Sequence, residues 1–330
     1  MGAVDLVELW RGGMLESVHR GHAVVWDRSG MIDGWGDPAQ VIFPRSSCKM
    51  IQALPLLESG AADAAGLGTE QLALACASHQ GALMHVSRVG AWLDGLELGE
   101  PDLRCGAHMP NDKAEAARLT CSSEAPCQLH NNCSGKHAGF LTWNRHHRGD
   151  AEYHLPDHPL QQAIRAATEE VTGETVAGYG IDGCSAPNFA VTISGLARAM
   201  AAFAAPGHGA RGTAMRRLTQ AMMLHPELVA GETRACTDLM RAMGGRVAVK
   251  TGAEAVFVAI APDRGLGIAL KIADGGTRGS EAAITALLTH YGLLDADHPV
   301  VAKYLTGPLR NWRGTDVAEL RLSGGFPRQH

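Results

Sequence analysis

Ser46 and Lys49 stand three residues apart at the start of an apolar stretch that predicts a helix over about 46–58. Residues i and i+3 share one face of a helix, so a hydroxyl and an amine at this spacing can meet across one turn. A serine hydroxyl is a weak nucleophile until a neighbouring base takes its proton. The spacing therefore indicates an activated serine, although an N-cap serine followed by a solvent-facing lysine gives the same pattern.

A second serine and a second lysine bear on this choice. Ser78 follows a run of small residues, and Lys250 opens a Lys-Thr-Gly run after an apolar strand. Taken alone, Ser78 is a capping serine and Lys250 a surface lysine. Lys-Thr-Gly on a strand recurs together with Ser-x-x-Lys in penicillin-binding proteins and serine β-lactamases. Because this chain has both runs in the same order, we favour the active-serine interpretation.

Two cysteines and a lysine form a candidate metal site. Cys133 and Lys136 have the i, i+3 spacing, and Cys184 follows about fifty residues later in a glycine-rich loop. Thiolates favour zinc, and three protein ligands leave a fourth position open. From the residues alone, buried free thiols are the default explanation.

Three residues near these motifs have the chemistry to bind a charged substrate. Arg45 precedes Ser46 and can hold a carboxylate in a bidentate fork, or pair with a surface acid. Asp182 is either a turn residue or a carboxylate for a substrate ammonium. His137 belongs to the loop that carries Cys133 and Lys136.

The predicted elements place Ser46 after strands and before helices. Short β-type runs separated by glycines indicate an antiparallel meander up to Phe43, and β-type runs return after Gly245. We predict an α/β (α+β) chain, with an antiparallel sheet from about 1–45 and 246–292 and a mainly helical region over about 46–245. The tail, 293–330, is expected to be irregular, and residues 1–330 to form a single compact catalytic unit.

Composition limits the class of function. The chain has 45% hydrophobic and 19% charged residues, and its net charge of −5 argues against nucleic-acid binding. No apolar run reaches the roughly 18 residues of a membrane span. The first residues lack a basic stretch followed by an apolar one, so we expect a cytoplasmic protein with free thiols and a small-molecule substrate.

Eight motifs, in one order from about Gly12 to Gly292, resemble the rhizobial-type L-asparaginases. They are Pro44–Lys49, Cys76–His79, Cys105–His108, Asn132–His137, Tyr153–Pro159, Asp182–Cys184, His225–Glu232 and Lys250–Ala253. The resemblance implies a fold like that of serine β-lactamases and penicillin-binding proteins, and a homodimer.

The resemblance also implies roles for the candidate residues. By motif position, Ser46 with Lys49 and Ser78 with Lys250 are two Ser-Lys pairs. The resemblance further implies a zinc ion that lies near the active site but takes no part in the reaction, with Cys133, Lys136 and Cys184 as its ligands. Substrate-binding residues of the pocket are Arg45, His137 and Asp182.

We therefore expect an L-asparaginase, which hydrolyses the side-chain amide of L-asparagine to L-aspartate and ammonia through a serine acyl-enzyme. A glutaminase is the nearest alternative, because one methylene is worth only about 1–3 kcal/mol of discrimination. The same residues also fit a penicillin-recognising Ser-x-x-Lys hydrolase or, in a different class, a zinc-binding regulatory protein.

Overall fold

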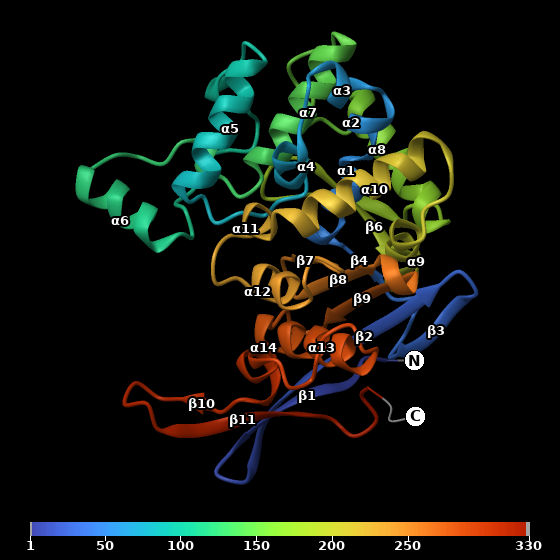
Figure 1. Ribbon diagram of the computed structural model, residues 1–330, viewed down its shortest axis with the longest axis vertical. Helices are drawn as coiled ribbons and strands as arrows, with labels where there is room; N and C mark the ends of the chain where they lie inside the picture. The colour runs from blue at the N-terminus through green and yellow to red at the C-terminus, as the bar shows by residue number, and fades with distance from the viewer. Residues whose placement is uncertain (1, 328–330) are drawn as a thin grey trace. The chain divides into compact units, whose positions relative to one another are not determined.

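The computed structural model describes residues 2–327 and contains two compact units (Figure 1). The sheet unit comprises residues 2–47, 191–205 and 238–327. The helical unit comprises residues 48–190 and 206–237. Among the described residues, no helix is long and apolar enough to cross a membrane.

An antiparallel sheet forms the centre of the sheet unit. Its strands follow the order β10-β11-β1-β2-β9-β8-β7, with β3 paired to β2. The strands are β1 (Val4–Arg11), β2 (Met14–Asp27), β3 (Gly30–Trp35), β7 (Ala248–Gly252), β8 (Val256–Ala261), β9 (Leu266–Ile272), β10 (Leu309–Arg310) and β11 (Asp316–Leu322). The predicted sheet of N-terminal and C-terminal segments around a helical middle is therefore confirmed.

Two helices cover this sheet. All six residues of β8 are buried, so both faces of the strand are covered. Helix α9 (Ile193–Ala204) and helix α13 (Thr277–His290) both pack against β8 and β9. The core of the sheet unit lies between these helices and the strands.

Gly267 permits the close contact between β9 and α9. A Cβ atom at this position would lie 2.0 Å from the Ala201 nitrogen and 2.5 Å from the Ala197 oxygen. Because both atoms belong to the helix backbone, a side chain would force the helix off the strand. We expect Gly267→Ala to lower the free energy of unfolding by about 3 kcal/mol or more.

Denaturant unfolding of Gly267→Ala beside Gly324→Ala checks this expectation. Gly324 is exposed, and a Cβ there would meet nothing within 4 Å. Equal stability of the two variants would show that α9 does not constrain the strand.

The helical unit supplies the remaining candidate residues. Its helices are α1 (Lys49–Gln52), α2 (Leu54–Glu58), α3 (Ala61–Ala64), α4 (Thr69–Ala75), α5 (Leu83–Gly95), α6 (Lys113–Ser122), α7 (Ser134–His147), α8 (Pro159–Thr172), α10 (Gly209–Leu224) and α11 (Pro226–Val229). Helix α12 (Ala235–Ala242) begins in this unit and ends in the sheet unit.

Three local predictions need correction. The tail is not wholly irregular, because β11 pairs with β1 along the edge of the sheet. The helix predicted over about 46–58 is a 3₁₀ turn, Arg45–Cys48, followed by α1 and α2, which are separate at Ala53. A hairpin of β5 (Gly178–Ile181) and β6 (Pro187–Thr192) was not predicted. The single catalytic unit over 1–330 stays a prediction.

Candidate active site

Ser46 lies in the 3₁₀ turn that ends the N-terminal meander. Arg45, directly before it, has a φ of 53°, a left-handed conformation that is uncommon for a residue with a side chain. The Ser47 hydroxyl closes the turn by donating to the Pro44 carbonyl at 2.7 Å. Such backbone strain persists where the surroundings impose it, and it is concentrated at functional sites.

Strand β7 passes close to this turn. A Cβ atom on Gly252 would lie 2.6 Å from the Pro44 oxygen and 3.0 Å from the Ser47 nitrogen. Only a glycine fits so close to the backbone of the turn. The glycine of Lys-Thr-Gly thus explains how the strand with Lys250 and the turn with Ser46 are brought together in the sheet unit.

Lys49 is a buried amine that bonds to a serine and a thiol. Its side chain is 1% exposed, and Nζ donates to Ser78 Oγ at 2.9 Å, to Cys133 Sγ at 3.1 Å and to the Ala77 carbonyl. The Ser78 backbone N–H donates to the Val229 carbonyl, which fixes the serine in the irregular segment after α4. A base and a hydroxyl in direct contact are the arrangement that proton transfer requires.

The other expected pairings are not tested by these contacts. Lys250 is 1% exposed, and its Nζ donates to the Thr251 carbonyl at 2.8 Å. Ser46 and Lys250 belong to the sheet unit, whereas Lys49 and Ser78 belong to the helical unit. The pairs Ser46 with Lys49 and Ser78 with Lys250 stay predictions.

The three proposed zinc ligands form one buried cluster in the helical unit. Lys136 Nζ lies 3.0 Å from Cys184 Sγ, and the two thiols are hydrogen-bonded to each other. The hydrogen bond from Cys133 and the Lys136 ammonium hold the pKa of Cys184 well below its usual range, against burial. Burial opposes the charge of Lys136, but the two sulfur atoms outweigh it and raise its pKa.

This donor set fits zinc. The cluster offers two sulfur atoms and an amine, all buried, with the amine in contact with Cys184 Sγ, and thiolate sulfur is a ligand that zinc prefers. Within residues 2–327 no group of three His, Cys, Asp or Glu side chains is placed to hold a metal, and the cluster supplies only two such residues because its third member is a lysine.

His137 adjoins the cluster. Its ring is fully buried, and burial lowers the pKa of His137 to about 4, although the Cys184 sulfur opposes this shift. Nδ1 is hydrogen-bonded to the Tyr153 hydroxyl at 2.9 Å, and that hydroxyl also accepts the Arg104 N–H at 2.9 Å. At neutral pH this imidazole is therefore uncharged.

Tyr153 is a supporting residue to which the sequence analysis gave no role, although it stands in one of the quoted motifs. We expect Tyr153→Phe to lower the free energy of unfolding by about 2–3 kcal/mol, because it leaves the buried His137 Nδ1 and the part-buried Arg104 N–H without this partner. Tyr179→Phe is the matched control, since Tyr179 is 52% exposed. Equal unfolding midpoints in denaturant would contradict this account.

Asp182 and Cys184 lie in the turn of the hairpin formed by β5 and β6. Asp182 Oδ1 accepts the Gly183 N–H at 2.7 Å, and its own N–H donates to the Ala186 carbonyl. The carboxylate also favours the charge on Lys136. Asp182 is thus both a turn residue and a charge beside the sulfur cluster.

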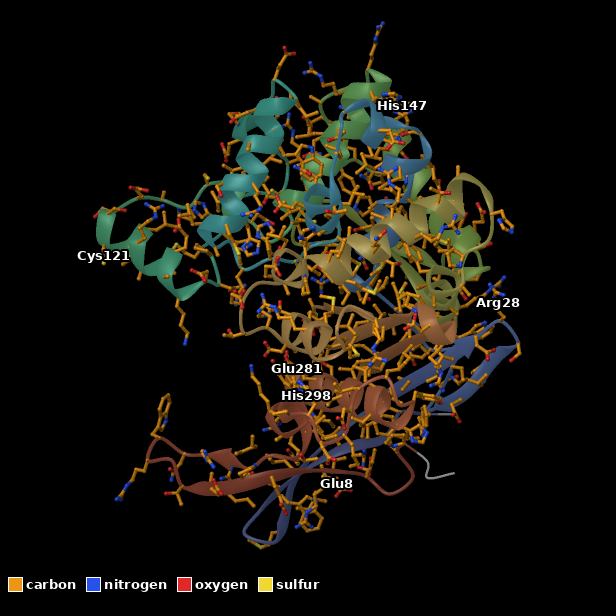
Figure 2. All side chains as sticks on the ribbon, in the orientation of Figure 1. Glu8, Arg28, Cys121, His147, Glu281 and His298 are labelled. Atoms are coloured by element: carbon orange, nitrogen blue, oxygen red, sulfur yellow. The ribbon has the colours of Figure 1, made fainter. Side chains whose placement is uncertain are left out.

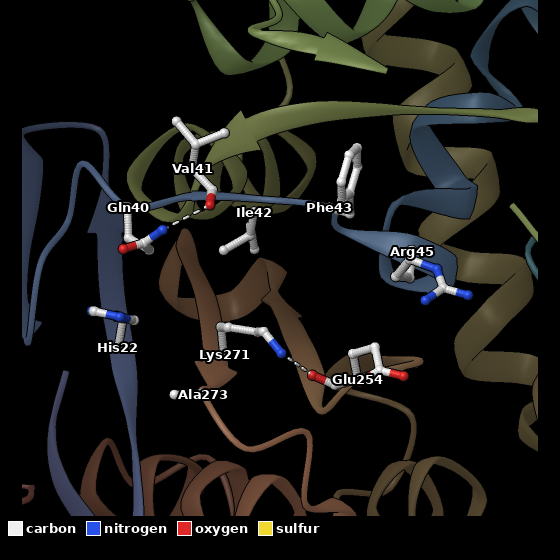
Figure 3. Close-up of a pocket in the computed structure, with 9 residues that line it drawn as sticks. All are labelled: His22, Gln40, Val41, Ile42, Phe43, Arg45, Glu254, Lys271 and Ala273. Carbon is white, nitrogen blue, oxygen red and sulfur yellow. Dashed lines mark hydrogen bonds between the residues drawn. The ribbon is translucent and has the colours of Figure 1, made fainter. Parts of the chain in front are cut away.

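A pocket of about 450 Å³ opens in the sheet unit next to Arg45 (Figure 3). Its lining residues are His22, Gln40, Val41, Ile42, Phe43, Arg45, Glu254, Lys271 and Ala273. His22 Nδ1 accepts the Asp37 N–H at 2.8 Å, which leaves the proton of the neutral ring on Nε2. Burial lowers the pKa of Lys271, whose amine donates to the Glu254 carbonyl.

Sequence reasoning found only Arg45 among these residues. His22 and Lys271 are cross-strand partners on β2 and β9. Their pairing depends on strand register over a separation of 249 positions, which no local pattern reveals.

A serine held by a buried lysine in an α/β chain is typical of hydrolases that use an activated hydroxyl. A family model described as L-asparaginase II matches residues 7–322. The chain therefore belongs to the L-asparaginase II family, the rhizobial-type family that its motifs indicated. Membership supports a hydrolase with a small-molecule substrate, and asparagine hydrolysis in general.

Solved structures similar to this chain have low sequence identity. The native form of Mglu is 13% identical, with 84% of this chain and 66% of Mglu covered and a TM-score of 0.49. A β-lactamase (Mb2281c) from Mycobacterium bovis is 14% identical, with 82% and 94% covered and a TM-score of 0.47. A putative β-lactamase from Bacteroides dorei is 11% identical, with 76% and 84% covered and a TM-score of 0.43. No curated protein sequence matches the chain.

Proposed function

We propose that this protein hydrolyses L-asparagine to L-aspartate and ammonia through a serine acyl-enzyme. Family membership over residues 7–322 supports amide hydrolysis. The observation that carries the catalytic proposal is the buried amine of Lys49 in direct contact with the Ser78 hydroxyl. An amine in this position can take a proton from one hydroxyl and pass it to another.

Ser46 is the nucleophile in this proposal. The neutral amine of Lys49 takes the Ser46 proton while Oγ attacks the side-chain amide carbon, and backbone N–H groups of the turn stabilise the oxyanion. The proton then passes through Ser78 to the amide nitrogen, the C–N bond breaks, and ammonia leaves. Water attacks the ester in the second half of the reaction, which releases L-aspartate and restores Ser46. Lys250 supports Ser78 as its partner, as the family resemblance implies.

Arg45, Asp182 and His137 bind the substrate. Arg45 contributes a guanidinium to the pocket next to Ser46, where a bidentate pair with the α-carboxylate is chemically favourable. Asp182 supplies a carboxylate for the α-ammonium. His137, neutral and buried, serves as a hydrogen-bonding group and not as a charge.

Zinc is the expected cofactor, held by Cys133, Lys136 and Cys184. When bound, it supplies a fixed positive charge that holds the two sulfur atoms and their loops in place. The Lys136 amine and the Cys133 thiol must each lose a proton to bind it.

Metal analysis checks the zinc proposal. We expect purified protein to carry zinc and Cys184→Ser to lose it, because the variant removes a thiolate from the donor set. Cys121→Ser, which alters an exposed thiol, should retain the metal. Equal zinc content in Cys184→Ser and the unmodified protein would contradict the assignment.

A homodimer in the cytoplasm is the remaining part of the proposal, and it rests on the family resemblance and on the sequence. Light scattering of the purified protein tests the dimer, and we expect the mass of two chains. The mass of a single chain at micromolar concentration would contradict the dimer.

Parallel assays of L-asparagine and L-glutamine test the function itself. We expect ammonia and L-aspartate from asparagine at a kcat/KM above that for glutamine. Faster release from glutamine would favour the glutaminase alternative. No release from either amide by zinc-loaded protein would contradict the proposal.

A further inference from the structure

Three side chains outside the proposed active site connect an acid, an imidazole and a thiol. Glu115 is on α6, Cys127 directly precedes the 3₁₀ turn Gln128–His130 of the helical unit, and His130 is the last residue of that turn. Glu115 Oε1 lies 3.2 Å from His130 Nε2, and His130 Nδ1 lies 3.3 Å from Cys127 Sγ. The imidazole thus touches the acid with one nitrogen and the thiol with the other.

The acid fixes which nitrogen of His130 carries the proton. Glu115 is 5% exposed and receives hydrogen bonds from Arg118 at 2.8–3.1 Å. These hydrogen bonds from Arg118 lower the pKa of Glu115 against the effect of burial, so the group stays a carboxylate. A carboxylate can only accept, and His130 therefore donates to it from Nε2.

His130 Nδ1 is consequently an acceptor that faces the thiol. It accepts the Cys127 backbone N–H at 3.1 Å, and the S–H group at 3.3 Å can donate to the same atom. A base oriented by a third group and within hydrogen-bond reach of a nucleophile is the requirement for nucleophile activation. The Glu115 carboxylate, 3.2 Å from Nε2, stabilises the imidazolium that forms when His130 takes the thiol proton.

Cys127 is also accessible, unlike most cysteines of this chain. It is half-buried, whereas Cys48, Cys76, Cys105, Cys133, Cys184 and Cys236 are buried. Cys121 on α6 is exposed (Figure 2), and its thiol makes no hydrogen bond within the described residues. Among the described residues, Cys127 is therefore an accessible thiol beside a base, and Cys121 is an accessible thiol without one.

We propose that Cys127, with His130 as its base and Glu115 as a positioning residue, is a nucleophilic modification site for small electron-poor alkenes. The sulfur adds to the alkene carbon that is β to the carbonyl and forms a C–S bond. The thiol proton moves to His130 Nδ1 and then to the carbon that is α to the carbonyl. No group leaves and no oxidant is needed.

Limiting N-ethylmaleimide on the whole protein at neutral pH tests this proposal. Digestion with a glutamate-specific protease cuts after Glu124 and separates the peptides of Cys121 and Cys127, which mass spectrometry then follows over time. We expect Cys127 to react about tenfold faster than Cys121, or more. Equal or slower reaction of Cys127 would overturn the proposal.

Two variants show whether the relay causes the difference. His130→Gln and Glu115→Gln should each slow Cys127 toward the rate of Cys121, while Cys121 keeps its own rate. Because Cys105 is buried, its labelling shows that a variant has failed to fold. If one of the two variants fails to fold, the Cys127 rate in the other, folded variant tests the relay. An unchanged Cys127 rate in a folded variant would overturn the roles of His130 and Glu115.

Discussion

Ser46→Ala is expected to abolish ammonia release from L-asparagine, with kcat lowered at least about 10,000-fold. The variant removes the only protein atom that forms a bond to the substrate carbon in the proposed mechanism. Lys49 and Ser78 would still be in contact, but neither could form the acyl-enzyme alone. A coupled ammonia assay with concentrated variant protein measures the remaining rate.

Ser47→Ala is the matched control, because it changes the neighbouring hydroxyl of the same turn. Ser47 Oγ donates to the Pro44 carbonyl and faces no reacting group, so the variant should lose about 1 kcal/mol of stability and keep its turnover. Near-normal turnover by Ser46→Ala would instead assign the nucleophile to another residue.

Lys49→Met is expected to lower kcat about 100- to 10,000-fold. Methionine has nearly the same volume, but it can neither take a proton from Ser46 nor donate to Ser78. The change also leaves the Ala77 carbonyl without this donor. Steady-state kinetics gives the effect on turnover, and thermal unfolding separates it from a loss of structure.

Lys113→Met tests the same substitution on the exposed surface of α6 and should leave kcat unchanged. If folded Lys49→Met had the turnover of the unmodified protein, Lys49 would have no catalytic role.

Much of the fold was predictable because its signals are local. Glycines between β-type runs define the meander, and the run of buried residues in β8 identifies a covered strand. Strand β11 was missed because its residues are mostly exposed and stand in a tail with several prolines. The hairpin of β5 and β6 was missed because β5 has only four residues, none of them buried.

The sequence predicts which residues belong to the candidate site better than it predicts which of them contact one another. Spacing and motifs selected Ser46, Lys49 and the cluster of Cys133, Lys136 and Cys184, and in the structure Lys136 lies in contact with Cys184. The bond from Lys49 to Ser78 joins residues that lie 29 positions apart, and the bond from Lys49 to Cys133 spans 84 positions. Such contacts depend on how the helices pack, which residue spacing does not determine.

The central claim, that the chain hydrolyses L-asparagine through Ser46, is tested most directly by trapping the covalent intermediate. Protein mixed with L-asparagine and quenched in acid within one turnover is digested, and its peptides are weighed by mass spectrometry. The account predicts an aspartyl group on the peptide that contains Ser46, and none in Ser46→Ala. An aspartyl group on Ser78, or steady turnover without any adduct and with Ser46→Ala still active, would contradict it.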